Sequence, residues 1–321
     1  MAVAVIGGAG FIGSNIVDEL LVNGFEVTVL DNFLDGKLEN LARWKGNDRL
    51  EVIRGDATDF ELVKRVLDHK AWVFHLAAMA RIQPSITDPH FALRNNIMST
   101  VNVLEAARLT GVKRVVYSAS SSVTGDKGAN LASHGRPTSE AVEPDLKSPY
   151  ALSKYVGEEL IDLYWKLYGL STVSLRYFNV YGPRHQEMGS YATVIAIFRK
   201  QARLGQPLTV VGDGTQRRDF TFVGDVTRAN MMAAMNQDVH GTLNIGTGKN
   251  YSMLEIAELV APGHPIEFVP VRKGEYAATL ADTTRAKNEL GWKAEIDFPT
   301  GLHVLDKYEQ MNTHSKLIVL R

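Results

Sequence analysis

A cluster of glycines between a short apolar run and an amphipathic stretch is the feature that most restricts how this chain can fold. Residues 2–6 are rich in valine, Gly7 to Gly13 have the spacing G-x-x-G-x-x-G, and residues 11–23 have a helical period that ends at Gly24. We therefore predict a strand, a tight turn and a helix. Glycines let the backbone of such a turn approach a ligand, and a helix N-terminus favours an anion such as a phosphate.

The same alternation continues along the first half of the chain. Strand-like runs alternate with helical patterns, the strands at 26–31, 50–54, 72–75, 113–118 and 172–176 and the helices at 60–68, 89–110 and 149–167. This order implies a parallel sheet covered by helices on both faces. After about residue 180 the elements become shorter, without a linker or a fixed repeat. We predict an α/β fold, a doubly wound (Rossmann) parallel sheet with a smaller interleaved α/β domain. The first domain is expected at 1–178, also receiving about 215–248, and the second mainly at 179–321.

Composition excludes several classes of protein. The 321 residues include 35 Lys+Arg and 36 Asp+Glu, a net charge of −1, so no overall field attracts nucleic acid. No window approaches the roughly 18 to 20 apolar residues of a membrane span, and no leader-like stretch is found, so we expect a cytoplasmic protein without a nucleic-acid or membrane partner. The chain has no cysteine, and neither His75 nor His185 has a partner at a ligand spacing, so no metal site is expected.

Asp31 identifies the dinucleotide that the glycine turn would hold. It ends the second predicted strand, 18 residues after Gly13, where a carboxylate can accept hydrogen bonds from the ribose hydroxyls of an adenosine. Asn32 and Phe33 follow in place of an arginine that would receive a 2′-phosphate. These residues predict binding of NAD rather than NADP.

Two further motifs carry chemistry. Tyr150 and Lys154 are four positions apart at the start of a predicted helix, so both side chains can point into one cleft. To act as a base at neutral pH, tyrosine needs its pKa lowered by about 3, which a nearby ammonium and a cationic nicotinamide can supply. The serine-rich run 117–122 follows a predicted strand, at the sheet edge where ligands bind. Taken alone, either motif is also compatible with an ordinary helix pair or a serine-rich loop.

Together these motifs resemble the extended short-chain dehydrogenase/reductase family, and within it the nucleotide-sugar (UDP-glucose and UDP-N-acetylglucosamine) 4-epimerases. The similarity runs nearly end to end, through Gly55-Asp56, His75 to Ala78, Arg176 to Arg184, Gly212 to Gly214, Arg218 to Phe220, Asn244 to Gly248, Arg272 to Glu275 and Leu290 to Trp292. The resemblance implies that Ser120 and Tyr150 handle the proton of a sugar hydroxyl, and that Lys154 binds the nicotinamide ribose and lowers the pKa of Tyr150.

The resemblance also implies which residues surround the two ligands. Those expected at NAD are Gly7, Gly10, Phe11, Ile12, Gly13, Asp31, Asn32, Asp56, Ala57, Leu76, Ala77, Ala78, Asn96, Ser118, Tyr150, Lys154, Tyr177 and Val180. Those expected at the nucleotide sugar are Ser120, Ser121, Ser122, Asn179, Val194, Arg218, Arg272, Thr279 and Arg81. Arg218 and Arg272 are implied to clamp the diphosphate. A homodimer through the helices at about 95–108 and 150–166 is implied in the same way.

The implied reaction is NAD-dependent 4-epimerisation of a UDP-sugar, UDP-GlcNAc/UDP-GalNAc and/or UDP-Glc/UDP-Gal, through a transient 4-keto sugar that turns about its phosphate linkage. NAD is expected to stay tightly bound and to be regenerated each turnover. Ser121 and Ser122 stand where dehydratases of the family have an acid pair, which disfavours elimination of water. The alternatives are a UDP-uronate 4-epimerase, a decarboxylase, a 2-epimerase or an oxidoreductase, and more remotely a regulator that binds NAD(H) without catalysis.

Four features bear on specificity. Thr279 stands where a bulky tyrosine would exclude a 2-acetamido group, so it leaves space for one. Arg81 replaces the small residues of relatives, so it either reads an acidic substituent of the sugar or points outward to solvent. Thr124 stands where relatives have tyrosine, and 127–139 resembles an enlarged loop. The tail at 316–321 is apolar enough to dock as a strand.

Overall fold

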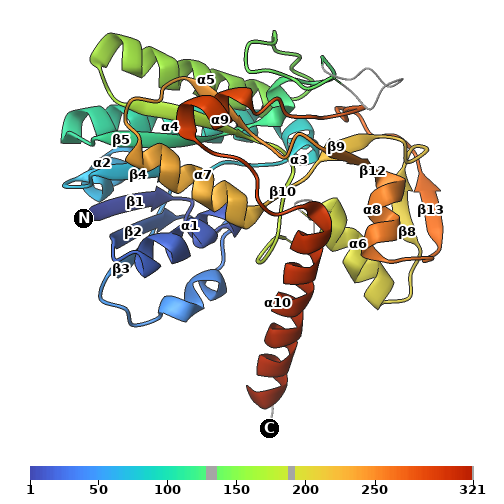
Figure 1. The fold of residues 1–321 in the computed structure, drawn as a ribbon. Helices are drawn as coiled ribbons and strands as arrows, with labels where there is room; N and C mark the ends of the chain where they lie inside the picture. Colours follow the sequence, from blue (N-terminus) through green and yellow to red (C-terminus); the bar gives the residue numbers. More distant parts are fainter. Residues whose placement is uncertain (128–135, 187–191, 320–321) are drawn as a thin grey trace.

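A seven-stranded parallel sheet forms the centre of the computed structural model, which describes residues 1–127, 136–186 and 192–319 (Figure 1). Its strands are β1 (Ala2–Ile6), β2 (Glu26–Asp31), β3 (Leu50–Arg54), β4 (Trp72–His75), β5 (Arg114–Ser120), β6 (Thr172–Tyr177) and β11 (Thr242–Ile245). Their order is β11-β6-β5-β4-β1-β2-β3, and every neighbouring pair is parallel. From β1 the chain adds β2 and β3 on one side, and then adds β4, β5, β6 and β11 on the other side. The order of the strands therefore reverses between β1 and β4, and the predicted doubly wound fold is confirmed.

Helices cover both faces of this sheet, with an apolar layer under each. On one face, α1 (Phe11–Val22) contacts α7 (Val223–Met235), and both contribute to one core cluster with the strands. On the other face, α2 (Phe60–Leu67), α4 (Pro89–Thr110) and α5 (Pro149–Tyr168) share a second cluster. Ser148 caps α5 by accepting a hydrogen bond from the Ala151 amide, and Gly169, with φ of +67°, ends that helix. Ser148 thus marks the start of α5 and Gly169 its end, and the start determines the positions of Tyr150 and Lys154 in the first turns of the helix.

A smaller part of the chain packs beside the carboxyl ends of the strands. It contains α6 (Val194–Arg203), β8 (Leu208–Val211), α8 (Met253–Val260) and β13 (Ile266–Val269), around a third apolar cluster. Two short strand pairs join it to the central sheet region, β7 (Val180–Tyr181) with β10 (Thr221–Phe222) and β9 (Arg217–Asp219) with β12 (Asn250–Ser252). Between these pairs the chain returns through α7 and β11 to the large sheet. The two parts therefore share chain segments.

The remaining elements are short or peripheral. They are η1 (Leu38–Trp44), α3 (Ile82–Thr87), η2 (Ser121–Val123), α9 (Thr284–Leu290) and α10 (Phe298–Val319). In Figure 1, α10 extends away from the body of the molecule. The expectation of a strand at 316–321 is wrong for 316–319, because these residues continue α10. Among the described residues, no helix combines the length and the apolar character that a membrane crossing needs.

Candidate active site

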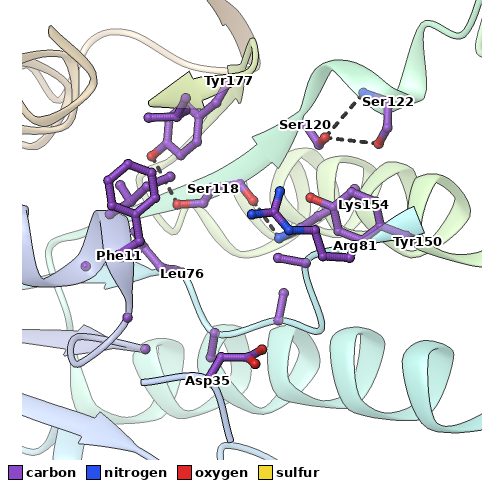
Figure 2. Close-up of a pocket in the computed structure, with 18 of the residues that line it drawn as sticks. Phe11, Asp35, Leu76, Arg81, Ser118, Ser120, Ser122, Tyr150, Lys154 and Tyr177 are labelled. Carbon is purple, nitrogen blue, oxygen red and sulfur yellow. Dashed lines mark hydrogen bonds between the residues drawn. The ribbon is translucent and has the colours of Figure 1, made fainter. Parts of the chain in front are cut away.

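A cavity of about 480 Å³ opens at the carboxyl ends of β1, β2, β4, β5 and β6. Figure 2 shows Tyr150 and Lys154 of α5 together with Ser120 from the end of β5 and Arg81 from the segment after β4. The predicted residues that line the cavity are Gly7, Gly10, Phe11, Ile12, Gly13, Asp31, Asn32, Asp56, Ala57, Leu76, Ala77, Ala78, Arg81, Ser118, Ser120, Ser121, Ser122, Tyr150, Lys154, Tyr177, Asn179, Val180, Arg218 and Thr279. Among the described residues, no group of His, Asp or Glu side chains could hold a metal ion.

The glycine turn is tight, and side chains at its glycines would collide with neighbouring backbone atoms. A Cβ on Gly13 would lie 2.2 Å from the carbonyl oxygen of Gly7, and one on Gly7 would lie 2.7 Å from the Ala77 nitrogen. Gly7 also has φ of +85°, a conformation that favours glycine. Gly10 precedes α1 without a side-chain cap, so the first N–H groups of the helix are available to an anion. The turn fits the pyrophosphate of a dinucleotide.

Asp31 and Asp56 bring carboxylates to the cavity from the ends of β2 and β3. The two oxygens of Asp31 accept backbone hydrogen bonds from Ala9 at 2.9 Å and Phe33 at 2.8 Å, and each keeps a lone pair for a hydroxyl. Burial raises the pKa of Asp31, against the effect of these hydrogen bonds. Burial also opposes ionisation of Asp56, but hydrogen bonds from Thr58 and from Asn32, the latter at 3.1 Å, lower its pKa below the usual value.

Lys154 is buried at the centre of the site, with 3% of its surface exposed. Its Nζ donates to the carbonyl oxygen of Ser118 at 2.7 Å and lies 4.8 Å from the centre of the Tyr117 ring. Burial lowers the pKa of Lys154 to about 7, although the carboxylate of Glu158 one turn later opposes that shift. Glu158 itself is held by a bidentate pair with Arg176, at 2.6 and 3.0 Å. Burial therefore disfavours the charged form of this side chain.

Tyr150 and Ser120 line the same cavity, Tyr150 from the start of α5 and Ser120 from the end of β5. Ser120 Oγ accepts from the backbone N–H of Ser122 at 3.2 Å and from its hydroxyl at 3.0 Å, as drawn in Figure 2. Burial raises the pKa of Tyr150, while the Ser120 hydroxyl and the charge of Arg81 oppose the increase. Lys154 is not among the groups that shift this pKa, so the expected lowering by Lys154 stays a prediction.

The wall on the substrate side is a hydrogen-bonded cluster. Thr279 Oγ1 accepts from Asn179 Nδ2 at 3.0 Å and from the Asp219 amide at 3.3 Å. The Nη2 of Arg218 lies 3.6 Å from the Oε2 of Glu275. Burial lowers the pKa of this arginine. A guanidinium and a carboxylate that both line the cavity can bind the phosphates and the hydroxyls of a nucleotide sugar.

Arg81 belongs to the cavity. The outward orientation that the sequence left open is wrong, because Arg81 lines the cavity and Figure 2 shows its guanidinium directed inward, on the side of Tyr150 and Lys154. Burial raises the pKa of Asp35, and the charge of Arg81 opposes this increase, so a cation and a carboxylate face each other across the cavity.

Three predicted contacts lie outside the cavity lining: Asn96, Val194 and Arg272. Asn96 is buried behind the wall, where it accepts from the Met79 amide at 2.7 Å and donates to Ser153 at 2.9 Å, so it positions the loop after β4. Val194 begins α6, and Arg272 is exposed. Of the two arginines expected at the diphosphate, Arg218 lines the cavity, and the pair stays a prediction.

The sequence missed several lining residues, among them Asp35, Gln83, Gln186 and Tyr276. Gln186 donates to the Asp35 carbonyl at 2.9 Å across 151 residues, a contact that no local pattern indicates. Thr124 is buried and donates to the Ser121 carbonyl at 2.9 Å, so it closes the serine turn. Most of the loop expected at 127–139 lies outside the described residues.

A doubly wound sheet with a glycine turn and a tyrosine–lysine pair at its switch point defines a dinucleotide-dependent enzyme. The chain belongs to the NAD dependent epimerase/dehydratase family, whose model matches residues 3–246. It is an NAD-dependent enzyme that modifies nucleotide sugars.

Similar proteins of this family carry more than one activity. The chain is 37% identical over 309 residues to the UDP-glucose 4-epimerase of Mycolicibacterium smegmatis, covering 94% of this chain and 96% of that protein. It is 34% identical to UDP-glucuronic acid decarboxylase 5 of Arabidopsis thaliana, covering 96% and 89%. The crystal structure of the Thermotoga maritima UDP-glucose 4-epimerase with UDP-glucose has a TM-score of 0.89 at 34% identity, covering 98% of this chain and 100% of that one.

Proposed function

We propose that the protein is a UDP-sugar 4-epimerase with tightly bound NAD, acting on UDP-GlcNAc/UDP-GalNAc and/or UDP-Glc/UDP-Gal. The observation that carries this proposal is the meeting of Tyr150, Ser120 and Lys154 in one cavity whose serine turn contains no carboxylate. Without an acid at Ser121 or Ser122, the turn supplies no proton donor for the elimination of water. The similarity to 4-epimerases over almost the full chain supports the same assignment.

The residues of this chain divide the work between binding and proton transfer. Asp31, the glycine turn and Lys154 would hold NAD, which when bound accepts a hydride from the sugar carbon and returns it. Tyr150 would remove the proton from the C4 hydroxyl through Ser120, and would give it back after the keto sugar has turned. Arg218 and Glu275 would keep the nucleotide in place while the sugar turns, because they grip the part of the substrate that does not react.

The decisive experiment is incubation of the purified protein with a panel of UDP-, dTDP-, GDP- and CDP-sugars without added NAD. We expect the C4 epimer of a UDP-sugar as the product, identified by chromatography and NMR, with no accumulation of NADH and no CO₂. Release of CO₂, a 2-epimer or steady consumption of external NAD would refute the 4-epimerase. The absence of any transient absorbance near 340 nm with every sugar would favour the non-catalytic regulator instead.

Thr279 is proposed to admit the 2-acetamido group. Replacing it with tyrosine fills the space beside Asn179 and removes the acceptor for two hydrogen bonds. We expect Thr279→Tyr to lower kcat/KM for UDP-GlcNAc by at least about tenfold more than for UDP-Glc, since a steric clash of this size costs about 1–3 kcal/mol. Equal losses for both sugars, in parallel assays, would reject Thr279 as the gatekeeper.

A second candidate, a UDP-uronate 4-epimerase, is favoured by Arg81. Its guanidinium enters the cavity on the side of Tyr150, so a carboxylate at C6 of a sugar whose C4 hydroxyl meets Tyr150 would lie within reach. A fork of N–H donors suits a carboxylate better than a hydroxyl. If this reading holds, Arg81→Ala lowers kcat/KM for UDP-glucuronate by about 10²-fold and changes that for UDP-Glc little. An unchanged preference between the two sugars excludes it.

The homodimer also remains a proposal. Exposed apolar side chains of α4 and α5, among them Met98, Leu152 and Leu163, would be covered by a second copy packed helix against helix. Light scattering coupled to size exclusion is expected to give twice the mass of 35.4 kDa, and Leu163→Glu is expected to give the monomer. A wild-type monomer at micromolar concentration would contradict the proposal.

A further inference from the structure

Tyr276 connects the substrate-binding segment to both elements that present the catalytic groups. The side chain is 6% exposed and lines the cavity. Its hydroxyl donates to the carbonyl oxygen of Ser122 at 3.0 Å, within the turn that begins at Ser120. On its other side, the Nζ of Lys147 lies 5.9 Å from the centre of the Tyr276 ring, and Lys147 precedes Ser148, the residue that caps α5 two positions before Tyr150.

The segment that carries Tyr276 also packs against the residues before α5. A Cβ on Gly274 would lie 3.3 Å from the Lys147 carbonyl oxygen. On the opposite side, the phenol proton of Tyr276 is used for the Ser122 carbonyl. A buried side chain that is held between two elements fixes their mutual position.

The segment that carries Tyr276 is itself anchored on both parts of the molecule. Gln83 donates to the Lys273 carbonyl at 2.7 Å, and a Cβ on Gly274 would lie 3.0 Å from the Ile82 side chain of α3. The next residue, Glu275, faces Arg218. Beyond Tyr276, the Arg217 amide donates to the Ala277 carbonyl at 2.9 Å. Tyr276 therefore lies midway between the nucleotide-sugar contacts and the serine turn.

We propose that Tyr276 is a positioning residue that holds the Ser120 turn and the start of α5 in register, so that Ser120 and Tyr150 reach the same substrate hydroxyl. It touches neither reacting atom, and acts through the Ser122 carbonyl and through Lys147, which precedes the cap of α5. The inference deepens the proposed function and rests on it. It requires only the first step, the transfer of a hydride from the sugar to NAD, which the epimerases and decarboxylases of the family would share.

The test compares Tyr276→Phe with Tyr181→Phe. Both changes remove one buried hydroxyl and keep the ring. Tyr181 donates to the Phe298 carbonyl at 3.3 Å inside the third apolar cluster, away from the cavity, so it controls for the loss of stability alone. The rate of reduction of bound NAD, followed near 340 nm after mixing with the preferred nucleotide sugar, reports the step in which Ser120 and Tyr150 act.

We expect Tyr276→Phe to slow this reduction about tenfold, with the KM for the nucleotide sugar within about twofold of wild type. The acid limb of its pH–rate profile is expected to move to higher pH, because a displaced Ser120 no longer stabilises the Tyr150 phenolate. Hydrogen exchange of the turn η2 is expected to rise as well. Tyr181→Phe should change none of the three.

Equal rates, profiles and exchange in the two variants would overturn the inference and leave the 4-epimerase untouched. If the wild-type product is not a 4-epimer while the bound NAD is still reduced, the proposed function falls and the role of Tyr276 is still decided by the comparison. A slower reduction with an unchanged pH profile and unchanged exchange would also reject the positioning role, since any loss of packing could produce it.

Discussion

Lys154 gives the most direct test of how burial sets the charges in this site. The pKa of its side chain falls from the usual 10.5 to about 7, chiefly through burial. A difference of this size corresponds to about 5 kcal/mol of free energy against the charged form. We propose Lys154→Met, which keeps the length of the side chain and removes the charge. Turnover should be lost, yet the protein freed of nucleotide should become more stable at low pH.

The sign and the magnitude of this change in stability follow from the difference between the pKa of Lys154 in the folded and in the unfolded chain. Below about pH 7 the lysine is charged in both the folded and the unfolded chain, so the folded state bears the full penalty, which disappears as the pH rises towards 10.5. Methionine avoids the penalty but loses the hydrogen bond to Ser118 and leaves Glu158 with Arg176 alone, which together cost about 2 kcal/mol. Lys154→Met should therefore be about 3 kcal/mol more stable than wild type near pH 6, and about equal near pH 9.

Urea unfolding at several pH values, on protein freed of nucleotide, measures this difference. Lys166→Met is the matched control on the same helix, because that side chain is 61% exposed and pairs with Asp162 at the surface. We expect it to leave the free energy of unfolding nearly unchanged at every pH. A Lys154→Met variant that is less stable than wild type at low pH, or whose difference does not vary with pH, would refute the reasoning.

Two further changes test the base and the glycine turn. Tyr150→Phe should lower kcat by roughly 10²–10⁴-fold while the bound NAD is retained, and steady-state turnover above a tenth of wild type would argue against its role as the base. Gly13→Ala places a Cβ 2.2 Å from the Gly7 carbonyl, so the turn must open and the purified protein should lose its NAD, measured as nucleotide released on denaturation; a normal NAD content would show that the turn tolerates a side chain.

Most of the cavity lining was predictable because it follows from local patterns. The glycine turn, Asp31 at the end of β2, and Tyr150 with Lys154 on one helical face are all set by the period of a strand or a helix. To predict where such a side chain points, it is enough to know the helix or strand that carries it, and the alternation of strand-like and helical patterns indicates these elements. Asn96 shows where this logic stops, because its partner, the Met79 amide, is 17 residues away and no local pattern indicates it.

The sequence by itself determined the doubly wound fold, the dinucleotide turn and the tyrosine–lysine pair, because these depend on neighbours within a few residues along the chain. Only the tertiary structure decided that Arg81 points inward, that Arg272 stays exposed, and that Tyr276 reaches the Ser122 carbonyl across 154 residues. The physical reason is that the direction of a side chain on a loop depends on which distant surfaces pack against that loop, and no local period encodes those contacts.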